Sequence, residues 1–228
     1  MWAHRGRGGG QQENTLDAFV WARRLGADGV ELDVHLSADG ELVVHHDAVV
    51  PGSGPIAEVR AADLPASVPS LLDVLSTCEG MVVNVEIKTS SRDAPTRPAA
   101  IAAAAVGAVV GSGAAGRVVL SSFSTDVLDA ALLASRAAGA EVRLGWLVPP
   151  VVDPHGTLGS VAGRGYHCVH PFVSWVDASL VRGARQAGLA LNVWTVNAPA
   201  DLQAMVDLGV DAVITDRPAE AMAVVRGS

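Results

Sequence analysis

The feature that most constrains this chain is a regular alternation of short apolar runs with longer helical patterns, from one end to the other. The apolar runs predict eight strands, at Trp2–His4, Gly29–Val34, Met81–Ile87, Val118–Ser121, Val142–Leu147, Tyr166–His170, Leu189–Trp194 and Ala212–Ile214. The stretches between them predict helices at Thr15–Leu25, Leu71–Thr77, Ala99–Val110, Thr125–Ala137, Ala178–Gln186, Ala200–Leu208 and Ala219–Val225. Strands separated by helices imply a parallel sheet, because parallel neighbours need crossover connections.

A parallel sheet of this kind either closes into a barrel or stays open as a doubly wound sheet. An open dinucleotide-binding sheet usually carries a glycine fingerprint directly after its first strand. The glycine-rich run from His4 to Gly10 lacks the required spacing, and no acidic residue marks the end of an NAD-type second strand. The length of 228 residues fits one barrel of roughly 200–250 residues. We therefore expect an α/β protein with a single domain, residues 1–228, folded as a TIM-type (β/α)8 barrel.

Turn, cap and loop residues in the sequence add detail to this predicted barrel. Asp39-Gly40, between two apolar runs, predicts a small β-hairpin that extends the second strand. Asn14 is predicted as the N-cap of the first helix. The segment Ala48–Val68 is rich in proline and glycine, and in a barrel we expect it to be a loop over the active face.

Composition limits the partners that the chain can have. Sixteen basic residues against twenty-four acidic ones give a formal net charge of −8. An acidic chain without a basic run repels nucleic acid and anionic membrane surfaces, whereas a small phosphate ester still binds where local cations dominate the field. The uncharged stretch from Pro98 to Gly116 is mostly alanine and glycine, so it predicts an outer barrel helix rather than a membrane span. The start shows no signal-peptide pattern, so a cytoplasmic location is expected.

Carboxylates gather at the carboxyl ends of the second and third predicted strands, where barrel enzymes place their catalytic groups. Glu31 and Asp33 are two residues apart, so both point to one face, and Asn84, Glu86 and Lys88 repeat this spacing on the next strand. Carboxylates that converge at one mouth repel each other, and a hard divalent cation such as Mg²⁺ or Ca²⁺ suits their oxygen ligands. A salt-bridge network that seals the barrel end is the alternative.

Two histidines and two cationic side chains lie at neighbouring strand ends. Hydrolysis of a phosphodiester requires neutralised nonbridging oxygens, a deprotonated nucleophile and a protonated leaving alkoxide. A metal cation with Arg5 and Lys88 would meet the first requirement. His4 and His46 would meet the other two, because imidazole titrates near neutral pH. Trp194 ends the seventh strand, either as a core aromatic residue or as a wall for the alcohol portion of a substrate.

The remaining histidines are expected to be structural or exposed. His170 has the position to reach the pocket, but a histidine satisfied within the barrel end is the favoured interpretation. Ser122 lacks a Gly-x-Ser-x-Gly elbow, so we expect a hydrogen-bonding role rather than a nucleophilic one.

An ordered set of motifs along nearly the whole chain resembles the glycerophosphodiester phosphodiesterase family. The motifs are His4-Arg5-Gly6, Glu13-Asn14-Thr15, Glu31-Leu32-Asp33-Val34, Asp39-Gly40, Val43-Val44-His45-His46-Asp47, Val85-Glu86-Ile87-Lys88, Ser122-Phe123, Trp194-Thr195-Val196-Asn197, and the later block from Gly209 to Pro218. One position departs from the family pattern, since Gln12 stands where a proline usually precedes Glu13.

The resemblance implies a barrel that cleaves small-molecule glycerophosphodiesters to glycerol 3-phosphate and an alcohol, with a divalent cation, Mg²⁺ or Ca²⁺. Carried over by position, it implies His4 and His46 as the general acid and base. It likewise implies three metal ligands and two phosphate contacts, which are Glu31, Asp33 and Glu86, and Arg5 and Lys88 respectively. Direct attack by water and a cyclic phosphate formed by the substrate's own hydroxyl both remain open.

Three other functions are compatible with such a barrel. A related lipid phosphodiesterase, phospholipase D-like or phospholipase C-like, would be expected to carry an export signal or a membrane-docking stretch. A barrel that only binds a phosphoester would be expected to have lost a histidine or a carboxylate. A metal-dependent aldolase or isomerase shares the fold but has no need of both histidines.

Overall fold

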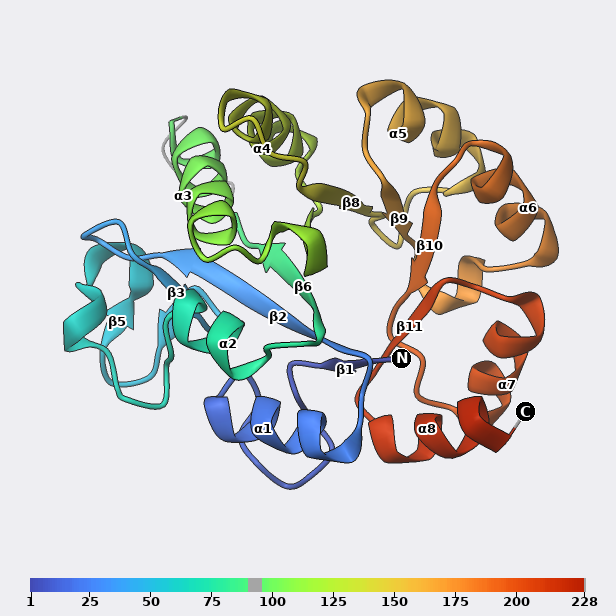
Figure 1. Cartoon of the computed structure of the whole chain (residues 1–228), viewed down its shortest axis with the longest axis horizontal. Helices are drawn as coiled ribbons and strands as arrows, with labels where there is room; N and C mark the ends of the chain where they lie inside the picture. The colour runs from blue at the N-terminus through green and yellow to red at the C-terminus, as the bar shows by residue number, and fades with distance from the viewer. Residues whose placement is uncertain (90–95, 228) are drawn as a thin grey trace.

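The computed structural model describes residues 1–89 and 96–227, and its strands form a closed barrel (Figure 1). The eight parallel strands are β1 (Trp2–His4), β2 (Gly29–Leu36), β6 (Val82–Ile87), β7 (Val118–Ser122), β8 (Arg143–Leu147), β9 (Cys168–His170), β10 (Ala190–Val193) and β11 (Ala212–Thr215). The ring is complete because the short β1 pairs with β11 on one side and with β2 on the other. The predicted (β/α)8 barrel is therefore confirmed.

Helices surround this barrel on the outside (Figure 1). They are α1 (Leu16–Leu25), α2 (Leu71–Thr77), α3 (Arg97–Gly111), α4 (Thr125–Ala137), α5 (Leu158–Arg164), α6 (Ala178–Gln186), α7 (Pro199–Leu208) and α8 (Pro218–Gly227). Short 3₁₀ turns lie at Ile56–Glu58, Ala61–Asp63, Ala115–Arg117, His155–Thr157 and Val173–Trp175. Helix α5 was not predicted from the sequence, because Gly159 and Gly163 lower its helix propensity. No helix in the described part of the chain is both long and apolar enough to cross a membrane.

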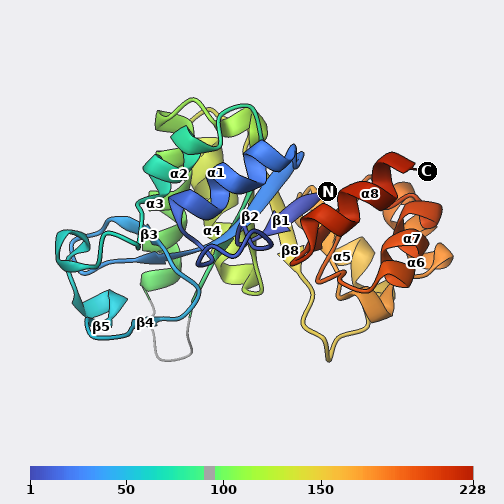
Figure 2. The ribbon, with the colours of Figure 1, turned by 90° about the horizontal axis from the view of Figure 1, so that it is seen from below.

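The chain leaves the barrel after β2 to form the predicted hairpin. Strand β3 (Leu42–Val44) pairs antiparallel with the end of β2, and Gly40 in the turn has a φ of 84°. Strands β4 (Val49–Val50) and β5 (Gly54–Pro55) form a second, two-stranded sheet. This excursion has a small apolar cluster of its own, made of Val43, Val50, Ile56 and Leu64. Figure 2 shows it as an arm beside the barrel.

The entry to α1 differs from the prediction. The N-cap is Thr15, whose side chain accepts a hydrogen bond from the Ala18 amide. Asn14 has a φ of 56° and uses its side chain elsewhere, since Nδ2 donates to Asp33 Oδ2 at 2.9 Å. The prediction was wrong because a cap residue was chosen by its type, whereas Asn14 serves the polar end of the barrel.

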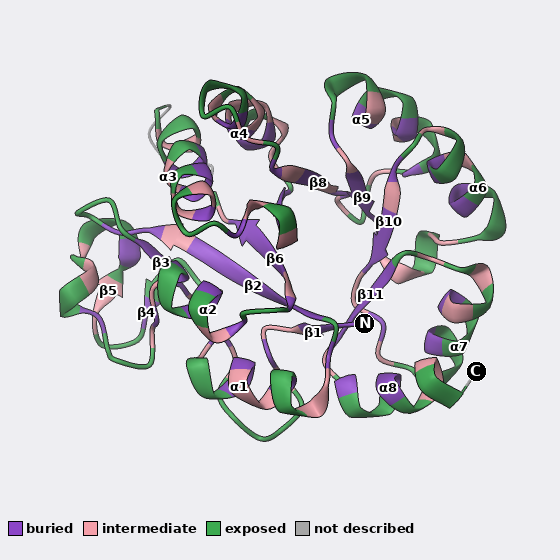
Figure 3. Ribbon diagram, in the orientation of Figure 1, coloured by how far each residue is buried: buried purple, intermediate pink, exposed green. Residues whose placement is uncertain are grey.

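Residue alternation along the strands separates two interiors. Val30, Leu32 and Val34 point outward into the main core between the barrel and the helices, which leaves Glu31 and Asp33 inside the barrel. The barrel interior contains a second apolar cluster, made of Trp2, Val119, Cys168, Ala212 and Ile214. In Figure 3 the barrel strands are mostly buried, with a few half-buried residues, and the helices are buried on the side that faces the strands. The apolar cluster closes the barrel beneath its polar carboxyl-terminal end.

Candidate active site

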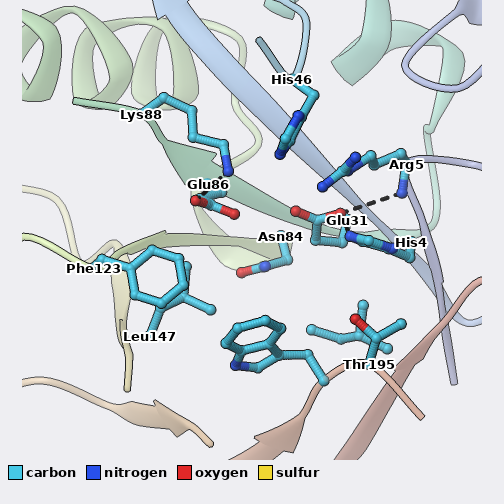
Figure 4. A pocket seen from close by; sticks show the side chains of 12 residues that line it. His4, Arg5, Glu31, His46, Asn84, Glu86, Lys88, Phe123, Leu147 and Thr195 are labelled. Carbon is cyan, nitrogen blue, oxygen red and sulfur yellow. Dashed lines mark hydrogen bonds and ion pairs between the residues drawn. The ribbon is translucent and has the colours of Figure 1, made fainter. Parts of the chain in front are cut away.

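A cavity of about 200 Å³ lies at the carboxyl ends of the strands (Figure 4). Its lining residues are His4, Arg5, Glu31, His46, Asn84, Glu86, Lys88, Phe123, Leu147, Trp194, Thr195 and Ile214. None of the described residues that line it belongs to Ala48–Val68, but Ala48, Ile56 and Ala57 of that segment line a neighbouring pocket together with Lys88. The segment also packs onto β3, because its apolar side chains are buried against Val43.

Three carboxylates converge at one side of the cavity. Asp33 on β2 lies opposite Glu86 on β6 in the parallel register, and Glu31 precedes Asp33 by two residues. One oxygen from each of the three lies within 4.8 Å of the others, and all three residues are buried. The strand spacing seen in the sequence thus produces the predicted convergence.

Burial and neighbouring charges divide these carboxylates into two kinds. Burial raises the pKa of Glu31 well above its usual value, and the charges of Asp33 and Glu86 raise it further. Burial likewise raises the pKa of Glu86 to about 7, against the opposing effect of Lys88. Burial also acts to raise the pKa of Asp33, but Lys88 and Arg5 outweigh it and lower that pKa below its usual value. Asp33 is therefore an anion, whereas Glu31 and Glu86 lack sufficient positive charge around them.

The cluster suits a hard divalent cation. Its possible ligand atoms are all carboxylate oxygens, and they lie close enough together to bind one cation. The pKa values of Glu31 and Glu86 are raised, and a bound cation would lower both. Lys88 takes part of that role in this structure, with Nζ 2.9 Å from Asp33 Oδ1 and 2.5 Å from Glu86 Oε1. Within the described residues, Glu31, Asp33 and Glu86 are the group whose ligand atoms would hold a metal.

His4 is oriented by a carboxylate that follows the last strand. Its Nδ1 lies 2.7 Å from Asp216 Oδ1, and its Nε2 lies 3.7 Å from Glu31 Oε2. Burial acts to raise the pKa of Asp216, but hydrogen bonds from His4 and Asn197 outweigh it and lower that pKa. An ionised carboxylate only accepts hydrogen bonds, so Asp216 selects the tautomer with the proton on Nδ1. His4 therefore presents Nε2 to the cavity.

Asp216 is itself held in place by Asn197. Asn197 Nδ2 donates to Asp216 Oδ2 at 2.8 Å, and Asn197 Oδ1 accepts from the Asp216 amide at 2.9 Å. Arg7 Nη1 also lies 3.3 Å from Asp216 Oδ1. The orientation of His4 thus rests on a network of charge-assisted hydrogen bonds.

His46 approaches the cavity from the hairpin side. It follows β3, and its Nδ1 lies 2.7 Å from Asp47 Oδ1. Its main-chain carbonyl is 3.0 Å from His35 Nε2, which ties this loop to β2. In Figure 4, His46 and His4 reach the region of Glu31 from different directions. The two imidazoles therefore flank one space, as the predicted acid and base must.

Arg5 lies among the carboxylates rather than apart from them. Its amide donates to Glu31 Oε2 at 3.2 Å, and its Nε lies 3.1 Å from Asp33 Oδ2. Glu13 Oε1 accepts from Arg5 Nη1 at 3.2 Å, and Glu13 also pairs with Arg7. Glu13 therefore braces two arginines, although Gln12 replaces the family's proline before it.

The opposite wall of the cavity is aromatic. Trp194 is in edge contact with Phe123 and Phe172, with ring centroids 5.6 and 5.3 Å apart. Its Nε1 donates to the His170 carbonyl at 2.8 Å, so the indole is fixed in place. Leu147 adds an aliphatic surface beside it. Trp194 thus lines the cavity and also packs against the apolar cluster inside the barrel.

The structure brings the predicted site residues together. Seven of them line the cavity, namely His4, Arg5, Glu31, His46, Glu86, Lys88 and Trp194, and the eighth, Asp33, is in contact with two of these. Sequence reasoning assigned no role to Asp216, Asn197, Phe123 or Asn84. Asp216, Asn197 and Phe123 stand within the motifs that carry the family resemblance, and Asn84 shares the inward spacing of Glu86, so signals for all four were present.

The barrel carries buried carboxylates, two histidines and two cationic side chains, Arg5 and Lys88, at its carboxyl-terminal mouth. These features define a class of barrel enzyme whose site suits phosphate esters. Comparison with known proteins narrows this class. The model of the glycerophosphoryl diester phosphodiesterase family matches residues 4–220. The chain belongs to this family.

Relatives match along almost their whole length. A glycerophosphodiester phosphodiesterase of Caldanaerobacter subterraneus subsp. tengcongensis is 32% identical over 246 residues, which cover 98% of this chain and 96% of the relative. The crystal structure of a glycerophosphodiester phosphodiesterase from Thermotoga maritima has a TM-score of 0.79 at 25% identity, covering 96% of this chain and 94% of the other. An Oleispira antarctica phosphodiesterase in complex with the product sn-glycerol-3-phosphate shares the fold, with a TM-score of 0.82, 23% identity, and coverage of 99% and 97%.

Proposed function

We propose that this protein hydrolyses glycerophosphodiesters to glycerol 3-phosphate and an alcohol, in a reaction that depends on a divalent cation. The observation that carries the proposal is the convergence of His4, His46 and the three carboxylates on one cavity beside Arg5 and Lys88. Membership of the family supports the reaction class. The proposed catalytic unit is the whole barrel, residues 1–228, acting as a single domain.

The charged groups divide the work of binding the phosphate. Glu31, Asp33 and Glu86 would hold Mg²⁺ or Ca²⁺, which when bound supplies positive charge for the nonbridging phosphate oxygens. Arg5 and Lys88 add fixed positive charge on the same side of the cavity. Because burial keeps water from screening them, these charges act strongly on a phosphate in the cavity.

The two histidines carry the proton transfers. One imidazole takes the proton from the attacking hydroxyl or water, and the other gives a proton to the leaving alkoxide. His4 is prepared for either role, because Asp216 holds its Nδ1 proton and leaves Nε2 free toward the cavity. His46 has a carboxylate of its own on Nδ1, Asp47, and completes the pair.

The experiment that tests this proposal measures release of glycerol 3-phosphate from a panel of glycerophosphodiesters that differ in the alcohol. Each reaction is run with EDTA and with Mg²⁺ or Ca²⁺ restored. Metal-dependent release supports the proposed reaction, and the best substrate names the alcohol. A folded protein that binds the cation but releases nothing from the panel would overturn it.

A further inference from the structure

One side chain of the cavity has hydrogen-bonding capacity that nothing in the described structure uses. Asn84 lines the cavity and is 1% exposed, yet neither its Nδ2 nor its Oδ1 has a hydrogen-bond partner. An unpaired buried amide is costly, and native proteins retain such groups where water or a ligand completes them. Each of its two polar atoms is therefore available to a bound molecule.

The position of Asn84 shows which part of a ligand would reach it. In the parallel register it lies opposite Glu31, and it precedes Glu86 by two residues on the same inward face of β6. Figure 4 shows its amide between the carboxylates of these two residues and the side chains of Phe123 and Leu147. A phosphate bound near the carboxylates thus has Asn84 beside it, at the border with the apolar wall.

The size of the cavity decides between the two arms of a phosphodiester. About 200 Å³ is below the roughly 300–1,000 Å³ of sites for drug-sized ligands. Asn84 lies two residues closer to the amino end of β6 than Glu86 does, so its buried amide is at the deep end of this small space. The small invariant arm, glycerol, fits there, whereas the alcohol arm of varying size must extend toward the mouth.

We propose that Asn84 is a specificity-determining residue, whose side-chain amide donates to and accepts from a free hydroxyl of the substrate's glycerol arm. The inference rests on the proposed function and names how the same site selects its substrates. A hydroxyl both donates and accepts, so it matches an amide that offers Nδ2 and Oδ1 together. The apolar wall of Phe123, Leu147 and Trp194 packs against the carbon chain of the same arm. A site built in this way rejects an analogue that lacks the hydroxyl, because the buried amide is then left unpaired.

The test measures binding of glycerol 3-phosphate and of its two deoxy analogues, propane-1,3-diol phosphate and propane-1,2-diol 1-phosphate, by calorimetry with saturating Mg²⁺. The wild type is expected to bind at least one analogue about 10–100-fold more weakly than glycerol 3-phosphate. Asn84→Ala is expected to bring that ratio close to one by weakening glycerol 3-phosphate alone. Asn84→Ser provides a second variant if the first unfolds, and thermal unfolding checks both.

Ser121 offers a matched control. Its hydroxyl is also buried and without a partner, and it lies opposite Glu86 on the next strand, but it does not line the cavity. Ser121→Ala should therefore keep the wild-type ratio between glycerol 3-phosphate and its analogues.

Equal binding of all three ligands by the wild type, or an unchanged ratio in Asn84→Ala, would overturn the inference. Weaker Mg²⁺ binding by Asn84→Ala without any ligand would overturn it as well, since Asn84 would then serve the metal. Hydrolysis of glycerophosphodiesters is measured separately. An enzyme that hydrolyses them but binds the analogues equally would refute the role of Asn84 and leave the proposed function standing. A protein that discriminates between glycerol 3-phosphate and its analogues but hydrolyses no glycerophosphodiester would support the role of Asn84 and refute the proposed function.

Discussion

His4 Nδ1 and Asp216 Oδ1 lie 2.7 Å apart, although 212 positions separate the two residues in the sequence. They meet because the barrel closes between β1 and β11, where Ala3 lies opposite Thr215 in the parallel register. The first strand therefore supplies an imidazole whose orientation depends on a carboxylate directly after the last one.

Replacing Asp216 should reduce turnover more than substrate binding. In Asp216→Asn the carboxylate that selects the His4 tautomer is gone, so we expect kcat to fall about 10–100-fold with KM almost unchanged. Steady-state kinetics on the best glycerophosphodiester measures both constants. Asp207→Asn removes the same charge on the exposed face of α7 and serves as the control. A loss that appears in KM alone would show that Asp216 acts on substrate binding instead.

Removing either imidazole should abolish most catalysis. We expect His4→Ala and His46→Ala each to lower kcat about 100–10,000-fold, because each removes one proton-transfer group. Circular dichroism and a metal titration should remain as in the wild type, since neither residue belongs to the carboxylate cluster. His155→Ala, in a 3₁₀ turn that does not line the cavity, is the matched control. Unfolding of both site variants would instead point to structural histidines.

Loss of one carboxylate should weaken the metal site. Glu86→Gln keeps the shape of the side chain but removes its negative charge, so we expect affinity for Mg²⁺ or Ca²⁺ to fall at least about tenfold. Calorimetric titration of the metal-free protein measures this directly. Glu79→Gln, at an exposed residue in the turn that follows α2, controls for net charge. An unchanged affinity would remove Glu86 from the ligand set.

The buried His170 should make the fold sensitive to mild acid. Burial lowers the pKa of His170 from 6.5 to about 3, so the unfolded chain takes up its proton at a higher pH than the folded one. Stability from this residue is complete above pH 6.5 and is lost as the pH falls toward 3, at about 1.4 kcal/mol per pH unit. Urea unfolding of the wild type and of His170→Gln at pH 7, 6 and 5 gives the comparison. The wild type should lose more stability than the variant across this range, and parallel slopes would contradict the assignment.

Much of the barrel was predictable because strand and helix periods differ. Two-residue spacing on the second and third predicted strands indicated that Glu31, Asp33 and Glu86 point to one face of the sheet. The parallel register of β2 and β6 agrees, since Asp33 lies opposite Glu86. Helix α5 was not predicted because its glycines lower the helix propensity of the segment. The helix is stabilised instead by tertiary packing of Leu158 and Val161 in the core.

The site residues on strands that are neighbours in the sequence were predictable. The contacts that form where the first and last strands meet were harder to predict. The motif that contains Asp216 was visible, but its contact with His4 exists only in the closed barrel. Asn84 has the same limitation in another form, because local sequence does not reveal whether a buried amide finds a partner. Asn14 was predicted from local sequence as a helix cap, but its side chain donates a hydrogen bond to Asp33 across the barrel mouth.

The closure of the ring through the three-residue β1 also orders events during synthesis. His4 leaves the ribosome before every other residue of the pocket, and Asp216 leaves after all of them. A nascent chain therefore carries the imidazole through the synthesis of the next 212 residues before the carboxylate that aligns it is made. Because non-local closure of this kind is a slow step of folding, His4 gains its alignment only when β11 pairs with β1. A fragment that ends after Thr195 but before β11 keeps most of the pocket's residues and lacks the carboxylate that orients His4.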